Sequence, residues 1–225
     1  MYMPMTSTST KAYKGIGMEG AIARWYATLT SKGMKDFEAL AQRVAPRLSP
    51  GSSVLEVAPG PGFFCIELAK LGPFHITGLD ISKTFVQLAR KNAAEAQMDV
   101  RFLQGNAAAM PFEDDCFNFL LCRAAFKNFA EPVCALQEMC RVLKPGGGAL
   151  IIDLRKDAPR AAINQAVEEM NLNSASRIMT KLAFRVSLLK RAYTKSDFQQ
   201  FLGQTNFGHV DIQESLTGFE IFLSK

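Results

Sequence analysis

Short runs of apolar residues alternate along the chain with longer stretches in which apolar residues recur every three or four positions. The apolar runs lie at residues 53–58, 74–80, 100–105, 117–123 and 149–154. Their length and composition predict buried β-strands, and the stretches between them have the period of amphipathic helices. Strands that alternate with helices in this way form βαβ units, so we expect an α/β fold with a doubly wound, mostly parallel sheet.

Local signals mark the ends of several predicted helices. The helix after the first strand extends its apolar face to Leu71. Ser82 precedes the helix that follows the second strand and has the side chain of an N-cap. Pro132 begins the helix after the fourth strand, and we expect Pro-Gly-Gly at 145–147 to end it.

The pattern changes after the fifth strand. Residues 157–192 contain two helical patterns and no convincing strand, which predicts a helical insertion over one end of the sheet. Basic and apolar residues interleave over 181–195, as in a basic amphipathic helix. The basic side of such a helix either faces solvent or contacts an anionic substrate, a membrane surface or RNA.

The last residues are expected to complete the sheet. Thr194 and Asp197 have the spacing of a capping box, and Thr217-Gly218 then separates two apolar segments that can form a hairpin with one antiparallel strand. We therefore expect a single domain made of a flexible tail (1–12), an N-terminal helical cover (13–48), a sheet core (49–156), the helical insertion (157–192) and a closing helix with a hairpin (193–225).

Composition limits the class of protein. The 225 residues, 48% of them hydrophobic, are enough for one sizeable core. No apolar run reaches the roughly 18 residues of a membrane helix, and the N-terminus lacks signal-peptide features, so we expect a cytoplasmic protein. The five cysteines form no CxxC pair and only two histidines are present, so we expect reduced thiols and no metal site.

The stretch VLEVAPGPGFFCIELAK (54–70) ends a strand on a glycine elbow and begins a helix. Without a Cβ, Gly60 and Gly62 let the backbone turn tightly and let a ligand approach it, while the helix start offers unpaired N–H groups. Ligands of open parallel sheets bind at the carboxyl ends of such strands. A purely structural turn would need the same glycines.

Asp80 ends the second strand and would face the same crevice, where its carboxylate can accept hydrogen bonds from vicinal ribose hydroxyls. Its alternative role is that of an acid near a helix N-terminus. Dinucleotides and S-adenosylmethionine both fit this geometry, but the third small residue of the dinucleotide fingerprint is replaced by Cys65. S-adenosylmethionine tolerates a less strict loop, and Glu56 in the first strand can address its amino acid end.

Four segments then carry a family resemblance. They are VLEVAPGPG, GLDIS, GNAAAMPFEDDCFNFLLCRAAFKNFAEP and LQEMCRVLKPGGGALIIDLR. In this order and spacing the sequence resembles the class I S-adenosylmethionine-dependent methyltransferase family, most closely the branch with the ubiquinone and menaquinone C-methyltransferases. The resemblance covers 50–156 strongly and 193–225 by pattern. It implies a seven-stranded sheet of order 3-2-1-4-5-7-6 with strand seven antiparallel.

The resemblance also implies cofactor contacts for S-adenosyl-L-methionine, with S-adenosylhomocysteine as product. By motif, Glu56, Ala58, Gly60 and Gly62 would line the methionine end, Asp80 and Ile81 the ribose, Asn106 and Ala107 the adenine, and Arg123 the cofactor carboxylate or the substrate. The family usually carries Asp at the position of Asn106, whose neutral amide makes a weaker contact.

Candidate substrate residues come from two places. They are Tyr13, Arg24, Trp25 and Tyr26 in the N-terminal segment, which in similar enzymes folds over the cofactor, and Phe126 and Lys127 after the fourth strand. Aromatic faces can contact a sulfonium or an acceptor ring. Arg24, Arg123 and Lys127 together would make the pocket mouth positive, which suits an anionic or aromatic acceptor. Core packing is an equal alternative for Trp25, and surface solvation for Lys127.

Methyl transfer from a sulfonium is an in-line displacement that positioning and water exclusion can drive, so no catalytic base is assigned. We expect His75 and His209 to be structural. Our prediction is a small-molecule methyltransferase whose insertion at 157–192 is a substrate lid. Nucleic acid as substrate is disfavoured because the Asn-Pro-Pro-aromatic tetrad is missing after the fourth strand.

Two alternatives stay open. One is methylation of a lipophilic quinone at a membrane surface, and the other is a non-catalytic S-adenosylmethionine-binding module. The acceptor atom and the oligomeric state are not predicted.

Overall fold

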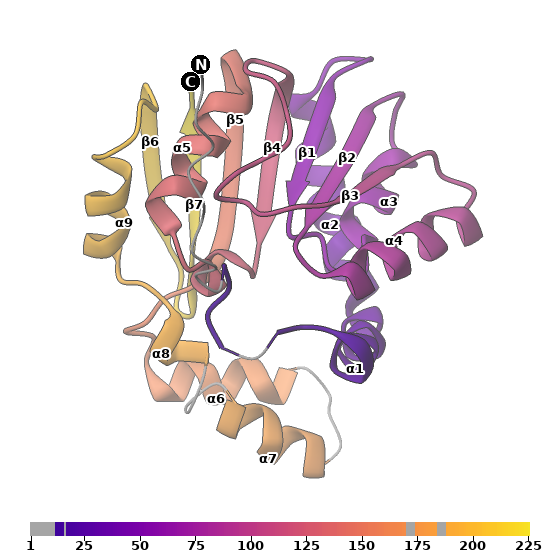
Figure 1. Cartoon of the computed structure of the whole chain (residues 1–225). Coiled ribbons are helices and arrows are strands. Elements are labelled where there is room, and N and C mark those ends of the chain that lie inside the picture. The colour runs from indigo at the N-terminus through magenta and orange to yellow at the C-terminus, as the bar shows by residue number, and fades with distance from the viewer. Residues whose placement is uncertain (1–11, 16, 170–173, 184–187) are drawn as a thin grey trace.

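A seven-stranded sheet forms the centre of the structure (Figure 1). The computed structural model describes residues 12–15, 17–169, 174–183 and 188–225. The strands are β1 (Ser53–Val57), β2 (His75–Asp80), β3 (Arg101–Gln104), β4 (Phe117–Arg123), β5 (Leu143–Leu154), β6 (His209–Glu214) and β7 (Gly218–Ser224). Their order is β3-β2-β1-β4-β5-β7-β6. β7 pairs antiparallel with β5 and β6, and the other pairs are parallel, which confirms the predicted fold class.

Helices cover both faces of the sheet. They are α1 (Gly20–Thr30), α2 (Met34–Val44), α3 (Phe63–Ala69), α4 (Lys83–Glu95), α5 (Pro132–Val142), α6 (Arg160–Glu169), α7 (Ser174–Ala183), α8 (Leu189–Arg191) and α9 (Lys195–Leu202), with short 3₁₀ turns η1 (Ser31–Gly33), η2 (Ala45–Arg47) and η3 (Phe126–Asn128). One core lies between the sheet and α2, α3 and α4, and the other beneath α5 and α9. α1, α6, α7 and α8 gather beyond the carboxyl ends of the parallel strands (Figure 1).

The central strand β1 shows why the hydrophobic pattern predicts this layering. Val54 belongs to the core under α3, whereas Leu55 and Val57 belong to the core under α5. All three side chains are fully buried, as expected for a parallel strand with helices on both faces. None of the described helices is long and apolar enough to cross a bilayer.

The helix caps read from the sequence are confirmed. Ser82 Oγ accepts the amide of Phe85 at 3.1 Å at the start of α4. Thr194 and Asp197 form a reciprocal capping box at the start of α9. These two caps fix where the chain leaves β2 and where it returns to the sheet after the helical insertion.

Three local expectations were wrong. Leu71 lies beyond the end of α3 and is 44% exposed, because the helix stops at Ala69. The Pro-Gly-Gly stretch does not end α5, which already ends at Val142; it lies inside β5 in a bulge between the pairs Phe117–Leu143 and Phe119–Gly148, where the register with β4 shifts. The bulge accommodates the residues of β5 that have no regular partner on β4.

The third error concerns the basic segment 181–195, which is not one helix. α7 ends at Ala183, and Ala192 and Thr194 are extended between α8 and α9; residues 184–187 lie outside the described part of the chain. Lys181 pairs with Glu168, at 2.6 Å, and Lys195 with Glu214, at 2.9 Å. Lys181 and Lys195 therefore serve separate local contacts and do not belong to one amphipathic face.

Candidate functional site

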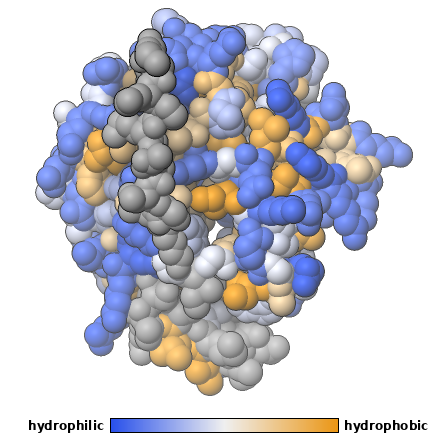
Figure 2. Space-filling model, viewed as in Figure 1, coloured by the Kyte–Doolittle hydropathy of each residue, from blue (hydrophilic) through white to orange (hydrophobic). Residues whose placement is uncertain are grey.

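Charged and phenolic side chains converge at the carboxyl ends of β1, β2 and β4, where the strand order reverses on either side of β1. Glu56, Asp80 and Arg123 come from the strands, and Tyr13 and Tyr26 from the N-terminal segment. The charges of Arg123 and Asp80 influence the pKa of both Glu56 and Tyr26, so these groups share one electrostatic environment. We call these five residues the carboxyl-end site. Figure 2 shows the surface hollowed at this level, between the sheet and the helices below it.

The glycine elbow after β1 turns the chain sharply beside this site. Ala58 has a φ of 57°, in the left-handed region that a residue with a Cβ seldom adopts, and its amide donates to Leu79 O at 2.8 Å. Gly60 follows with a φ of 56°, and no described atom lies within 4 Å of where its Cβ would be. The main chain at Gly60 therefore presents an open face to a ligand.

Gly62 serves a different purpose from Gly60. A Cβ at Gly62 would lie 2.7 Å from Phe102 Cζ and 2.9 Å from Ala89 Cβ. Its φ of 79° also belongs to the left-handed region. Gly62 is thus required for the close packing of α3 on its neighbours, and the ligand role that the resemblance gave to both glycines fits Gly60 better.

Asp80 is 5% exposed and binds main-chain amides with both carboxylate oxygens. Oδ2 accepts Gly60 N at 3.0 Å and Oδ1 accepts Ser82 N at 2.8 Å. Burial raises the pKa of Asp80 to about 6, against the lowering effect of these two hydrogen bonds. Each oxygen keeps a second lone pair, so the carboxylate can still accept from a ligand hydroxyl.

Glu56 is the second buried carboxyl group of the site, at 3% exposure. Its Oε2 accepts the thiol of Cys65 at 2.9 Å. Burial raises the pKa of Glu56 to about 7, while Cys65 and the charge of Arg123 act in the opposite direction. Cys65, which stands where the dinucleotide fingerprint needs a small residue, is thus a hydrogen-bond donor to the site's acid.

Arg123 and Tyr26 complete the site. The guanidinium of Arg123 lies over the ring of Phe37 from α2, 4.4 Å from its centroid. Tyr26 packs edge-on against Phe85, and burial raises the pKa of its phenol although Arg123 lowers it. The phenol therefore stays protonated at neutral pH and can donate a hydrogen bond.

The residues expected to contact the adenine and the ribose differ in how far their side chains are exposed. Ile81 is 37% exposed directly after Asp80. Asn106 is half-buried, and its Oδ1 accepts the amide of Ala108 at 3.0 Å. Ala107 belongs to the core under α5, so its methyl group packs inward and only its main chain is left for a ligand.

The positive pocket mouth expected from the sequence is not formed. Lys127 is 4% exposed, and its Nζ donates to Asp153 Oδ1 at 2.8 Å. Arg24 and Trp25 lie on the exposed side of α1. Phe126 is fully buried and stacks on Phe198, so it packs in the core and does not form a pocket wall.

Sequence reasoning missed the importance of Asp153. Its Oδ2 accepts Lys127 N at 2.8 Å and its Oδ1 also accepts Leu154 N at 2.7 Å, so one carboxylate fixes η3 against the end of β5. The sequence did offer a signal for Asp153, since it is an acidic residue at the end of a buried strand and basic residues follow it. The lysine that neutralises it comes from another strand end, which periodicity cannot reveal.

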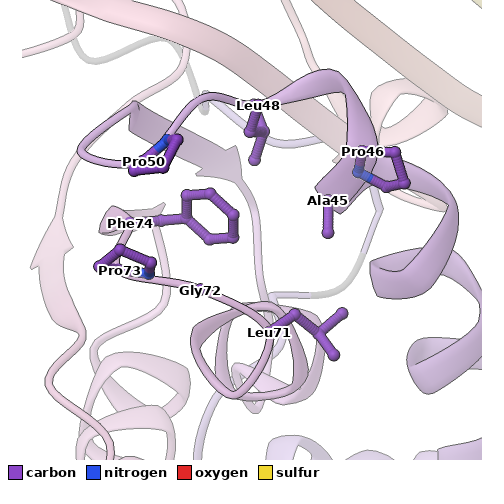
Figure 3. A pocket seen from close by; sticks show the side chains of 8 residues that line it. All are labelled: Ala45, Pro46, Leu48, Pro50, Leu71, Gly72, Pro73 and Phe74. Atoms are coloured by element: carbon purple, nitrogen blue, oxygen red, sulfur yellow. The ribbon is translucent and has the colours of Figure 1, made fainter.

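A pocket of about 340 Å³ lies at the other end of the strands, beside the amino ends of β1 and β2 (Figure 3). Its lining is Ala45, Pro46, Leu48, Pro50, Leu71, Gly72, Pro73 and Phe74. None of these side chains carries a charge or a hydrogen-bonding group. His75 and His209 are exposed first residues of β2 and β6, away from the carboxyl-end site. The apolar pocket therefore offers no side chain for acid–base or ionic chemistry, whereas the carboxyl-end site does.

Comparison with known proteins gives sequence relatives. A family model described as a methyltransferase domain matches residues 48–206. A demethylmenaquinone methyltransferase of Deinococcus radiodurans is 40% identical over 101 residues, which cover 44% of this chain and 42% of that protein. One of Chlorobaculum tepidum is 31% identical over 150 residues, covering 66% and 58%. The chain thus spans about half the length of the curated relatives it matches.

Solved structures share the fold. A putative S-adenosyl-L-methionine-dependent methyltransferase from Methanococcus maripaludis superposes with a TM-score of 0.76 at 22% identity, covering 94% of this chain and 95% of that one. Phosphoethanolamine N-methyltransferase 2 of Haemonchus contortus, solved with phosphomonomethylethanolamine and S-adenosylhomocysteine, gives a TM-score of 0.65 at 17% identity, covering 85% and 43%. At these identities the likeness extends to the fold alone.

Proposed function

Because the chain belongs to the methyltransferase domain family, we propose that it transfers a methyl group from S-adenosylmethionine to a small-molecule acceptor at the carboxyl-end site. One observation carries this proposal: the Asp80 carboxylate and the open main chain of Gly60 meet through a 3.0 Å hydrogen bond. An acid beside bare backbone at a strand switch point suits a ribose-bearing ligand.

The charges of the site fit this cofactor. Glu56 and Asp80 are both buried, and their raised pKa values reflect the absence of water around the charged form. A sulfonium and an ammonium group are cations that would favour the ionised carboxylates. Arg123, which lies near Glu56, is the matching partner for the amino acid carboxylate of the cofactor.

When bound, S-adenosylmethionine supplies an electrophilic methyl group on a sulfonium that leaves as a neutral thioether. Asp80 would accept from the ribose hydroxyls, and Gly60 would let the ligand lie against the backbone. Glu56 and Arg123 would hold the amino acid end. Alignment of the acceptor with the methyl group in a site without water then supplies most of the acceleration.

Tyr26 is the residue we assign to the acceptor side. Its phenol remains protonated at neutral pH because burial raises its pKa. It can therefore orient an acceptor oxygen or nitrogen by a hydrogen bond but is a poor base. The proton that the acceptor loses would leave with solvent as the site opens, and helices α6 to α8 are the candidate lid.

A lipophilic acceptor at a membrane surface is the second candidate. Trp25 on α1 is 61% exposed, and Ile178 and Leu182 on α7 are 67% and 58% exposed. Figure 2 shows the apolar patch of α7 at the lower end of the molecule, beyond the carboxyl ends of the strands. Exposed apolar side chains at that end suit an acceptor that is only partly drawn out of a bilayer.

Thermal unfolding with S-adenosylhomocysteine or NAD tests the main proposal. We expect S-adenosylhomocysteine to raise the melting temperature and NAD to leave it unchanged. Asp80→Asn should abolish most of the shift, while Asp99→Asn, at an exposed position before β3, should retain it. Stabilisation by NAD alone, or an equal S-adenosylhomocysteine shift in Asp80→Asn, would contradict the assignment.

A further inference from the structure

The N-terminal residues 12–15 and 17–20, which we call the strap, cross the carboxyl edge of the sheet (Figure 1). At one end Lys14 N donates to Asn128 O at 2.7 Å. At the other, Ser82 Oγ donates to Met18 O at 2.6 Å, and the Glu19 carboxylate accepts the amide of Lys83 at 2.9 Å. The strap is therefore held both after β4 and at the start of α4.

Arg191, at the end of α8, contacts the same end of the strap as Asn128. Its Nη1 donates to Lys14 O at 3.0 Å, and its guanidinium also hydrogen-bonds the hydroxyl of Tyr13. Gly15 has a φ of 89°, and a Cβ there would lie 2.6 Å from Arg191 Nη1. The missing side chain at Gly15 is thus what allows the guanidinium to lie against the strap.

A second contact from the same segment supports this one. The ammonium group of Lys14 donates to the Tyr193 hydroxyl and lies 4.5 Å from the centroid of its ring. Tyr193 is in turn anchored to the sheet, because its carbonyl accepts Lys156 N at 3.0 Å. Residues 191 and 193 therefore join the strap to the end of the helical segment on one side and to β5 on the other.

These contacts determine the surroundings of Tyr13. Burial raises the pKa of its phenol, Arg191 lowers it, and the charge of Asp80 raises it, so the hydroxyl is near enough to both charged groups to respond to them. The phenol of Tyr13 also acts on the pKa of Tyr26. Tyr13 therefore belongs, with Asp80 and Tyr26, to the side chains gathered at the carboxyl ends of the strands.

We propose that Arg191 is a positioning residue for the cofactor: it fixes the Tyr13 hydroxyl near the Asp80 carboxylate, where the nucleoside would bind. This inference rests on the proposed function. Arg191 itself does not touch the ligand. Its loss should free Tyr13 and let the ligand dissociate faster without changing the chemistry of the methyl group.

The test is S-adenosylhomocysteine binding by calorimetry, with dissociation followed by stopped flow. Arg191→Gln should weaken binding by about tenfold, the worth of one charge-assisted hydrogen bond, mainly through faster dissociation. Arg191→Lys should restore part of the affinity because it keeps the charge. Lys190→Gln, the exposed neighbour on the same helix, is the matched control and should bind like the wild type.

A double-mutant cycle separates positioning from mere stabilisation. In a Tyr13→Phe background, Arg191→Gln should weaken binding by less than about twofold, because the hydroxyl it acts through is gone. Gly15→Ala, which displaces the guanidinium but retains its charge, should reproduce the faster dissociation. It also provides the answer if Arg191→Gln fails to fold.

The outcomes are distinguishable. If the wild type binds no S-adenosylhomocysteine, the proposed function falls and this inference with it. If the wild type binds and the Arg191→Gln and Gly15→Ala variants bind equally well, only the positioning role is overturned. An undiminished effect of Arg191→Gln in the Tyr13→Phe background also overturns it, since a purely structural role predicts that additivity.

Discussion

Replacing Glu56 by Gln should remove a specific part of the protein's pH-dependent stability. Glu56 is buried, and its pKa is raised from 4.5 to about 7 in the folded chain. Between these two pH values the folded protein retains a proton that the unfolded chain has released. The free energy of unfolding therefore falls as the pH rises through this range, and levels off above it.

The size of the effect follows from the two pKa values. Linkage between 4.5 and about 7 gives a loss of about 2 to 3 kcal/mol between pH 5 and pH 8. Gln has nearly the same shape and keeps an oxygen that can accept the Cys65 thiol, which Glu56 binds at 2.9 Å. Asp80 also has a raised pKa and titrates in both proteins, so its own contribution largely cancels in the comparison, although its charge also acts on Glu56.

Urea unfolding followed by far-UV circular dichroism measures this difference. Tryptophan fluorescence is a poor choice because the only tryptophan, Trp25, is 61% exposed. Glu95→Gln, at an exposed position on α4, is the control and should keep the wild-type pH dependence. Parallel profiles of unfolding free energy against pH for the wild type and Glu56→Gln would refute the reasoning, since they would mean that burial does not disfavour the ionised form of Glu56.

Four further substitutions and one double variant test the packing of the site by urea unfolding. Gly62→Ala should destabilise by about 2 kcal/mol because its Cβ has no room, whereas Gly60→Ala should cost about 1 kcal/mol for its positive φ and mainly weaken S-adenosylhomocysteine binding. Lys127→Met should cost about 3 kcal/mol or more by leaving Asp153 buried and unpaired, and adding Asp153→Asn should recover part of it. Ser82→Ala should cost about 1 kcal/mol as a lost N-cap. Three results would contradict the contacts described. They are equal losses of unfolding free energy for the two glycine variants, no recovery of stability in the double variant, and an unchanged stability in Ser82→Ala.

The hydrophobic pattern predicted the sheet because burial on both faces leaves a continuous apolar run in each parallel strand. Val54, Leu55 and Val57 show this directly, since they face two different cores yet are all apolar. The order of the strands came from the family resemblance, because periodicity does not say which strands are neighbours. The ends of α3 and α5 were missed, since competing turn and bulge geometry decides them within a few residues.

Prediction of which residues converge at the strand ends succeeded where the determinants are local in the chain, and the ligand roles given to these residues stay predictions. The hydrogen bond between Gly60 and Asp80 agrees with the expectation that these two residues converge, because each stands at a strand end that the pattern had located. It failed for Lys127, whose burial depends on Asp153 from another strand. The role of Arg191 depends on a contact between residues far apart in sequence, which composition and spacing cannot show.

The buried charges also explain why the elbow suits S-adenosylmethionine better than a dinucleotide. Of the buried acids in the part of the chain that the structure describes, Asp153 has the ammonium of Lys127, whereas Glu56 and Asp80 have no lysine and carry raised pKa values. A pyrophosphate placed beside two such carboxylates would add like charge and raise their pKa values further. A cation would do the opposite. We therefore expect S-adenosylmethionine and S-adenosylhomocysteine, which share the ammonium group at the amino acid end, both to bind more tightly as the pH rises through about 7, where Glu56 ionises. Titration of both ligands across this range checks the argument, and an affinity that does not grow with pH would contradict it.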